Sequence, residues 1–228
     1  DYVRFIISNV KGHVTYYEIF NEPNIADSVQ WIEAEDYTNL VRRVVPVIRQ
    51  EDPEGKIMLA GTTYLIEPGA REYLFKVISS DIMPLVDVVA WHPMFGASPE
   101  VDSDYYYEYP SIIQQIKDTA SAHGFTGEYH AGEISWWTDM EPQAQDPGIW
   151  YSDIAAAKYH ARGIVMHLGM DVSVTNNATP SAFPSRRYAD FAIKNLCTIM
   201  AGAEATHLPV TIETEATNLR SYGFSLPN

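Results

Sequence analysis

The sequence predicts an α/β fold in which the strands of a parallel sheet alternate with helices. Short runs rich in β-branched and aromatic residues alternate with longer amphipathic runs along most of the chain. This alternation is typical of successive strand–helix units, whose strands are parallel. Of the 228 residues, 46% are apolar and 20% are charged, so the chain has enough apolar side chains for one large core.

The elements follow one another in order. We expect a helix over 2–10, a strand over 13–20 and then the loop segment NEPNIADSV. Further helices are expected near 35–50, 70–79, 111–124, 152–169 and 186–202, and further strands at 56–61, 86–92, 128–134 and 172–176. The stretch before Pro110 is rich in Pro, Asp and Tyr and is expected to be a loop. Its YYYEY run is either a stacking platform for sugar or an exposed loop.

Five strand–helix units of roughly 30 residues match the repeating unit of a (β/α)8 TIM barrel, which has about 250 residues in eight units. The predicted architecture is therefore a partial barrel over residues 1–207, with three units fewer than a full barrel. Residues 208–228 change to an alternating pattern without helical period, and we expect one or two strands there. Because the pattern starts and stops abruptly, we expect the chain to be part of a longer protein.

Charge and composition exclude several classes of partner. Thirty acidic residues against fifteen basic ones give a net charge of -15, and no basic run is present that would follow a phosphate backbone. We therefore expect no binding to nucleic acid. No run of about 18 apolar residues predicts a membrane span. The single cysteine, Cys197, provides neither a disulfide nor a CxxC metal pattern.

Polar residues gather directly after the predicted strands, where the functional face of a parallel α/β protein lies. Asn21, Glu22 and Pro23 follow the first strand, His92 ends the third, and Glu133 lies at the end of the fourth. The tryptophans beside them are Trp91, Trp136 and Trp137. Cleavage of a glycosidic bond needs two such carboxyl groups, because one donates a proton while the other attacks the sugar or activates water.

The strings YEIFNEPN and GEISWW, with Glu133 standing 111 residues after Glu22, resemble the clan A glycoside hydrolases. These are retaining (β/α)8 enzymes with two glutamates at the ends of barrel strands four and seven. The resemblance covers nearly the whole chain, from within helix three to beyond helix eight. It implies that Glu22 is the general acid/base, that Glu133 is the nucleophile, and that Asn21 binds the 2-hydroxyl of the sugar.

The same resemblance implies that His92 lies near the nucleophile and that the substrate is a β-linked poly- or oligosaccharide. It implies no cofactor and no metal. The clan often carries a tyrosine within two residues of this histidine, where the chain has Met94 and Phe95. The expected substitutes are Tyr64, Tyr105, Tyr106 and Tyr107. Strand eight lacks the usual tryptophan, so sugar stacking is expected from the three tryptophans named above.

Two departures concern the ends of the partial barrel. Glu18 has the same strand parity as Phe20, so we expect it to point into the barrel interior, where a carboxylate needs a partner. The string NLRSYGFSLPN resembles the opening strands of the small β-sandwich that follows the barrel in many of these enzymes. We therefore interpret 208–228 as the start of a β-rich C-terminal segment.

Two other hypotheses stay open. The chain is alternatively a truncated, non-catalytic carbohydrate-binding barrel, whose exposed edges favour self-association or a partner chain. A third hypothesis is a metal hydrolase at His92, His130 and Glu133, although no tight ligand spacing such as HExxH supports it. The substrate class and the acidity favour a secreted or periplasmic location over others.

Overall fold

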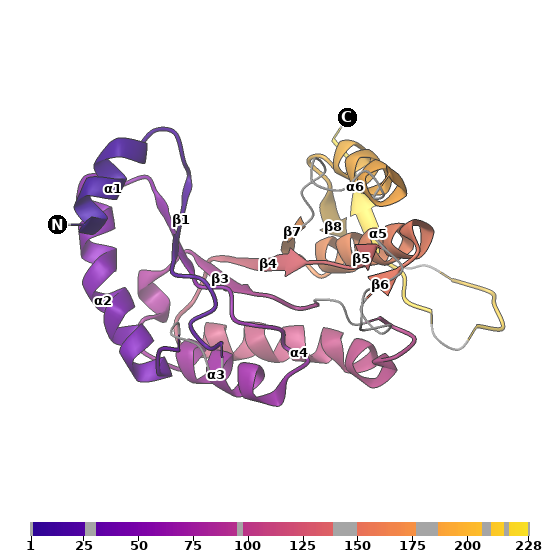
Figure 1. Cartoon of the computed structure of the whole chain (residues 1–228), viewed down its shortest axis with the longest axis horizontal. Helices are drawn as coiled ribbons and strands as arrows, with labels where there is room; N and C mark the ends of the chain where they lie inside the picture. The colour runs from indigo at the N-terminus through magenta and orange to yellow at the C-terminus, as the bar shows by residue number, and fades with distance from the viewer. Residues whose placement is uncertain are drawn as a thin grey trace. The chain divides into compact units, whose positions relative to one another are not determined.

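The computed structural model describes residues 2–25, 31–94, 98–138, 150–176, 187–206, 211–216 and 219–227 (Figure 1). Five strands form one sheet in the order β1-β2-β3-β4-β7, and the pairs among the first four are parallel. Their bounds are β1 Tyr16–Ile19, β2 Lys56–Leu59, β3 Val88–Trp91, β4 Glu128–Ile134 and β7 Ser173–Asn176. Helices alternate with these strands along the chain, which confirms the predicted α/β fold.

The helices are α1 Tyr2–Val10, α2 Ala34–Glu51, α3 Pro68–Ile78, the short 3-10 helix η1 Met83–Leu85, α4 Ser103–Ala122, α5 Asp153–Gly169 and α6 Arg187–Ile199. Two small strand pairs were not predicted as such. The strands β5 Trp137–Thr138 and β6 Trp150–Tyr151 pair in parallel, and β8 Glu204–Thr206 pairs antiparallel with β9 Gly223–Ser225. Over the described residues, no helix is both long and apolar enough to cross a membrane.

The expected loop before Pro110 is wrong, because α4 already begins at Ser103 and contains this proline. Proline removes a helical hydrogen bond, which is why the sequence pattern indicated a break. The helix persists because Tyr105 and Tyr109 are buried, and the Tyr105 hydroxyl donates to the Pro93 carbonyl at 2.5 Å. The YYYEY run is therefore part of a packed helix, neither an exposed loop nor a platform that offers all its rings to sugar.

The chain divides into two compact units, Asp1–Met94 with Ser103–Gly132 and Phe95–Asp102 with Glu133–Asn228. The division falls inside strand β4, and the predicted boundary between 207 and 208 stays a prediction. In the first unit, Tyr17 and Ile19 of β1 are buried while Glu18 is exposed, so alternate residues face opposite sides. The Gly61 N–H donates to Glu18 Oε1 at 2.9 Å, which gives this carboxylate a hydrogen-bond partner.

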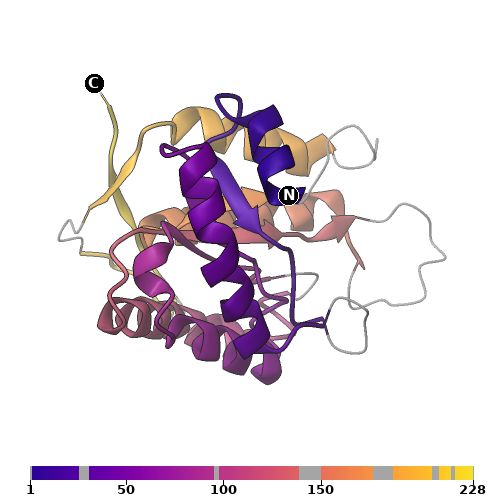
Figure 2. The same ribbon diagram turned by 90° about the vertical axis from the view of Figure 1, so that its left-hand side faces the viewer.

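Helix α2 lies beside β1, as Figure 2 shows, and a buried tyrosine joins the two. The Tyr37 hydroxyl donates to the Ile19 carbonyl at 3.0 Å and accepts from the Ala60 N–H at 2.7 Å. Burial, as the largest cause, raises the pKa of Tyr37, so the phenol stays neutral and keeps its proton for this bond. One side chain thereby fixes the ends of both β1 and β2.

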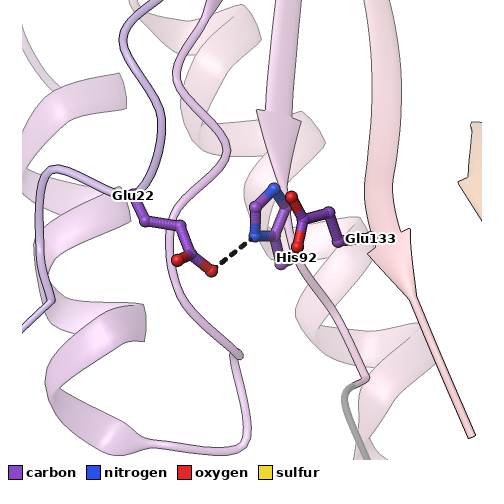
Figure 3. A group of neighbouring side chains, drawn as sticks. All are labelled: Glu22, His92 and Glu133. Atoms are coloured by element: carbon purple, nitrogen blue, oxygen red, sulfur yellow. Dashed lines mark hydrogen bonds and ion pairs between the residues drawn. The ribbon is translucent and has the colours of Figure 1, made fainter. Parts of the chain in front are cut away.

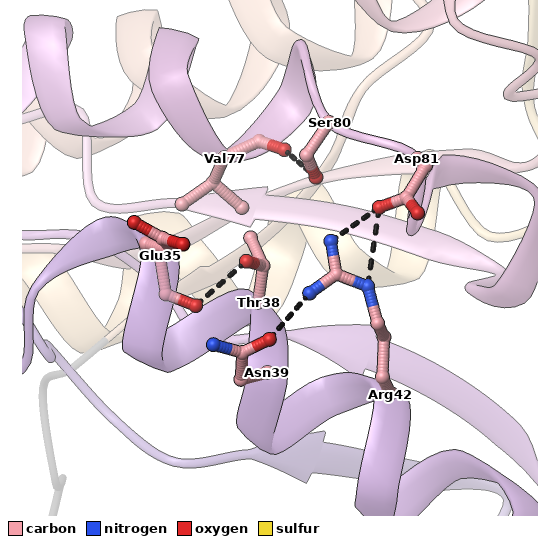
Figure 4. Close-up of polar contacts among 7 residues, drawn as sticks. All are labelled: Glu35, Thr38, Asn39, Arg42, Val77, Ser80 and Asp81. Atoms are coloured by element: carbon pink, nitrogen blue, oxygen red, sulfur yellow. Dashed lines mark hydrogen bonds and ion pairs between the residues drawn. The ribbon is translucent and has the colours of Figure 1, made fainter.

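A polar network joins α2 to the segment after α3 at the surface (Figure 4). Arg42 binds Asp81 as an ion pair and donates to Asn39 Oδ1 at 2.7 Å. The Ser80 hydroxyl donates to the Val77 carbonyl at 2.7 Å, which satisfies an acceptor at the end of α3. Exposed pairs of this kind add little stability, so the network orients the helices more than it stabilises them.

In the second unit, α5 and α6 pack together. Ser152 caps α5 by accepting from the Ala155 N–H at 3.3 Å. The Asp153 carboxylate accepts from the N–H groups of Tyr188 and Ala189, at 2.7 and 3.2 Å, in the first turn of α6. An anion at this position also suits the positive end of the helix dipole.

Candidate functional site

The loop after β1 holds Glu22 in an uncommon backbone conformation. Phe20 and Glu22 have positive φ angles of 74° and 46°, which only a few per cent of non-glycine residues adopt. Such conformations cost about 1–3 kcal/mol each and persist where the surroundings impose them. Here the Glu22 N–H donates to the Gly61 carbonyl at 2.9 Å, which fixes the glutamate beside the end of β2.

Glu22 is hydrogen-bonded to His92, the residue that directly follows β3 (Figure 3). The distance from His92 Nδ1 to Glu22 Oε1 is 2.8 Å. The side chain of His92 is buried, with the residue 3% exposed, and its backbone N–H donates to the Thr62 carbonyl at 3.0 Å. The sequence placed both residues at strand ends, and the structure brings them into contact. The resemblance also implied that His92 lies near the nucleophile, and this part stays a prediction.

Two glycines enclose the imidazole of His92. A Cβ atom built on Gly61 would stand 2.2 Å from His92 Nε2, and one built on Gly132 would stand 3.1 Å from His92 Cδ2. The imidazole therefore occupies the space that any larger residue would need at the ends of β2 and β4. Close packing of this kind allows the ring little freedom to turn away from Glu22.

Glu133 belongs to β4, and its position follows from the strand. Trp91 of β3 pairs with Ala131 of β4, so Glu133 comes two residues beyond the last pair, towards the carboxyl end. Its φ angle is 41°, which makes it the second candidate glutamate with a left-handed backbone. Strained residues in protein structures cluster at functional sites, so this conformation is a pointer to function that the sequence did not offer.

An amide clamp that the sequence analysis missed holds the same loop. Asn24, which is buried, donates from Nδ2 to Thr63 Oγ1 at 2.7 Å, and its Oδ1 accepts from the Thr63 N–H at 2.9 Å. The second Asn of the NEPN string was the available signal, but only the fold shows its partner. Asn21, the expected ligand of the sugar 2-hydroxyl, is exposed, and its role stays a prediction.

Two of the three tryptophans expected to stack on sugar are buried in the structure. Trp91 is completely buried, and its indole N–H donates to the Tyr109 hydroxyl of α4 at 2.9 Å. Trp136 is also buried and packs edge-on against His160 of α5, with ring centroids 5.0 Å apart. Both are core residues in this structure, and their buried rings offer no surface for a sugar to stack on. The side chain of Trp137 lies outside the described residues.

Four tyrosines were expected to replace the clan residue near the histidine, and the structure describes the setting of two of them as follows. Tyr105 is committed to the Pro93 carbonyl, as described above, and Tyr107 is exposed on α4. The phenol of Tyr105 stays protonated because burial raises its pKa well above the ordinary value. A role for Tyr64 or Tyr106 stays a prediction.

The residues that could hold a metal ion differ by one from the set of the metal hypothesis, His92, His130 and Glu133. Within the described part of the chain, one suitable set of ligand-type residues is present, Glu22, His92 and Glu133. His130 is not part of this set. Burial, followed by the charge of His92, lowers the pKa of His130. Two carboxylates and one imidazole are also the groups that acid–base chemistry uses, so the set does not by itself indicate a metal.

The fold and the site define a class of protein. The chain is a parallel α/β protein that presents glutamates and a histidine at the carboxyl ends of its strands, which is where active sites lie in barrels of this kind. No protein-family model matches the sequence, and no curated protein matches it either.

Solved structures show which proteins share this fold. A family 39 glycoside hydrolase from Bacteroides cellulosilyticus WH2 matches 90% of this chain with a TM-score of 0.59 and 16% identity. A family 44 xyloglucanase from Paenibacillus polymyxa matches 85% with a TM-score of 0.59 and 11% identity. A family 51 α-L-arabinofuranosidase from Bifidobacterium longum matches 73% with a TM-score of 0.55 and 14% identity.

This chain covers 45%, 48% and 38% of those three proteins, so it spans less than half of their length. The shared fold agrees with the barrel-type α/β fold that the sequence predicted, and this chain corresponds to a part of each of those proteins. At identities this low the likeness concerns the fold. What the chain does therefore depends on its own residues.

Proposed function

We propose that this chain is the catalytic region of a retaining glycoside hydrolase that cleaves β-glycosidic bonds of poly- or oligosaccharides. One observation carries the proposal. Glu22 and Glu133 follow or end two strands of one sheet, β1 and β4, and both have a positive φ angle. Two separate strained glutamates at the functional edge of a barrel-like sheet are difficult to explain as solvated loop acids.

The proposed reaction has two steps. In the first, the Glu133 carboxylate attacks the anomeric carbon and forms a covalent glycosyl ester, while Glu22 gives its proton to the leaving oxygen as the glycosidic bond breaks. In the second, Glu22 takes a proton from water, and the resulting nucleophile attacks the same carbon and releases Glu133. The retaining route needs the two carboxyl groups about 5–5.5 Å apart.

His92 and Asn21 have supporting roles in this proposal. The hydrogen bond between His92 Nδ1 and Glu22 Oε1 engages this oxygen, so in this proposal Oε2 exchanges a proton with the substrate. Asn21 immediately precedes Glu22 and would bind the 2-hydroxyl of the sugar, a contact that strengthens in the transition state. The chemistry requires no cofactor and no metal. A carbohydrate polymer as substrate agrees with a secreted or periplasmic protein.

Covalent trapping tests the proposal. The 228-residue chain is incubated with activated 2-deoxy-2-fluoro glycosides of glucose, xylose and arabinose, and its intact mass is measured. We expect a sugar-sized mass gain on the native chain and none on Glu133→Gln. A variant at the amino edge of the sheet, Glu128→Gln, serves as the matched control and should be labelled like the native chain. Labelling of Glu133→Gln would show that another residue is the nucleophile.

A second candidate is a non-catalytic partial barrel that associates through its edge. The exposed apolar side chains of Phe5 on α1 and of Tyr16 on β1 favour it, since β1 pairs only with β2 among the described strands. Sedimentation of the chain as a dimer, with no adduct from any fluoro-glycoside, would support this candidate. The metal hydrolase hypothesis predicts instead that a chelator abolishes turnover.

A further inference from the structure

Trp31 is an exposed tryptophan close to Glu22 that the sequence analysis did not single out. Its side chain is 44% exposed, whereas the other two tryptophans with described side chains are buried. The next residue, Ile32, donates its N–H to the Pro23 carbonyl at 2.8 Å. Trp31 precedes Ile32 in the chain, and Glu22 precedes Pro23, so each is next to one partner of this hydrogen bond. This backbone bond brings the segment that carries Trp31 beside the segment that carries Glu22.

Two contacts hold the indole in one orientation. Its N–H donates to Glu33 Oε1 at 2.8 Å, and its ring meets Tyr73 of α3 edge-on, with centroids 6.1 Å apart and an interplanar angle of 65°. Tyr73 is itself fixed, because it is buried and its hydroxyl donates to the Ile32 carbonyl at 3.0 Å. Burial and the charge of Glu33 raise the pKa of Tyr73, so this donor keeps its proton.

The indole of Trp31 keeps part of its surface exposed while both of these contacts are made. The polar edge of the ring is satisfied by Glu33, and an edge-on contact with Tyr73 leaves aromatic surface open to solvent. Aromatic rings with little freedom to lose are efficient binding surfaces, because ordering them on binding costs little entropy. The axial C–H groups of a pyranose ring present an apolar face that suits such a surface.

We propose that Trp31 is a stacking platform for a sugar ring next to the ring on which Glu22 acts. This inference rests on the proposed function and deepens it, because it names a residue that would bind a neighbouring sugar unit. A platform beside the cleavage point favours a chain of several sugar units over a monosaccharide glycoside. The aromatic contact for sugar would then come from the loop after β1 and not from the tryptophans expected after β3 and β4.

Binding measurements test the platform without requiring turnover. Cellohexaose and xylohexaose are titrated calorimetrically into Glu133→Gln, and then into the same variant carrying Trp31→Ala or Trp31→Phe. We expect Trp31→Ala to weaken binding of the preferred hexasaccharide about tenfold, and Trp31→Phe to lose less, since a phenyl ring keeps part of the surface. Tyr2→Ala, which removes an exposed ring from α1, is the matched control and should bind like its parent.

Kinetics on the native chain add a second readout. Trp31→Ala should raise KM more for the hexasaccharide than for a nitrophenyl monosaccharide glycoside, and its circular dichroism and thermal melting should match those of the native chain. Equal affinity of Trp31→Ala and its parent would overturn the proposal, and so would a parent that binds neither hexasaccharide. Failure of the proposed function would be seen in a different experiment: Glu133→Gln would keep the native turnover, or a fluoro-glycoside would label it.

Discussion

The two edges of the sheet in the first unit contain similar residues in opposite settings. At the carboxyl edge, Glu22 pairs with His92, which is almost completely buried between two glycines. At the amino edge, Glu128 pairs with Lys56 and accepts from the Tyr16 hydroxyl at 3.2 Å, and all three side chains are exposed in part or in full.

The backbone separates the two edges as clearly as burial does. Glu22 has a positive φ angle, whereas none of the three described residues at the amino edge has one. A glutamate with a nearby cation is therefore not by itself a sign of chemistry. The combination of strain, close packing and a strand end distinguishes the carboxyl edge, and each prediction below tests one part of that distinction.

The largest difference is expected between two variants that change a glutamate at each edge, Glu22→Gln and Glu128→Gln. Glu22→Gln should slow turnover of an oligosaccharide about 10²–10⁴-fold, because a carboxamide neither donates nor accepts the proton of the reaction. Glu128→Gln should leave turnover unchanged, since this residue lies at the other edge. Steady-state rates with the best substrate from the trapping panel measure both. Equal loss in the two variants would mean that the edges do not differ in function.

The packing around His92 gives the second prediction. Gly61→Ala places a methyl group where His92 Nε2 stands, and this overpacking should lower the free energy of unfolding by about 1–3 kcal/mol. The displaced imidazole should also reduce turnover. In Gly69→Ala the new methyl meets nothing within 4 Å in the first turn of α3, so this control should be slightly more stable than the native chain.

Urea denaturation measures the free energy of unfolding of both glycine variants, and activity assays measure their turnover. If Gly61→Ala were as stable and as active as Gly69→Ala, the imidazole would have room to move, and the argument from close packing at the carboxyl edge would be lost.

Much of this comparison was within reach of the sequence. Hydrophobic periodicity located the five parallel strands and their helices, and parallel strands bring their carboxyl ends to one edge whatever the loops do. That is why the sequence pattern alone groups Glu22, His92 and Glu133. The bounds predicted for β4 agree with the structure to the residue.

The sequence could not show which way a side chain points. Trp91 and His92 are neighbours in the chain, yet one packs on α4 and the other reaches Glu22. A fully buried strand has no alternation of polarity to mark its faces, and β3 is buried at every position. The burial of Trp91 and the exposure of Trp31 depend on tertiary packing and were therefore not predictable from local pattern.

The amide clamp, in which Asn24 binds Thr63, gives the third prediction. Asn24→Ala removes both hydrogen bonds to Thr63 and leaves a partly buried hydroxyl and N–H without this partner, which should cost about 1–3 kcal/mol of stability. Asn39→Ala removes only an exposed contact with Arg42 and should change stability little. Thermal unfolding compares the two. A smaller effect for Asn24→Ala than for Asn39→Ala would show that water replaces the clamp readily.

The smallest effect is expected from the amino edge itself. The hydrogen bond from Lys56 to Glu128, as the largest cause, raises the pKa of this lysine, and the ammonium also lies 5.4 Å from the centre of the Tyr16 ring. Because these groups are open to solvent, water and salt replace most of what their contact provides. A double-mutant cycle with Lys56→Met and Glu128→Gln should therefore give a coupling energy near the limit of detection.

The coupling between Lys56 and Glu128 should depend on salt concentration, whereas the packing around His92 should not. The coupling should vanish in about 1 M sodium chloride, where the Debye length falls to about 3 Å, whereas the effect of Gly61→Ala should persist. A large coupling that survives in salt would place the amino edge in the same category as the carboxyl edge. Burial and backbone strain would then no longer distinguish a functional glutamate from a structural one in this sheet.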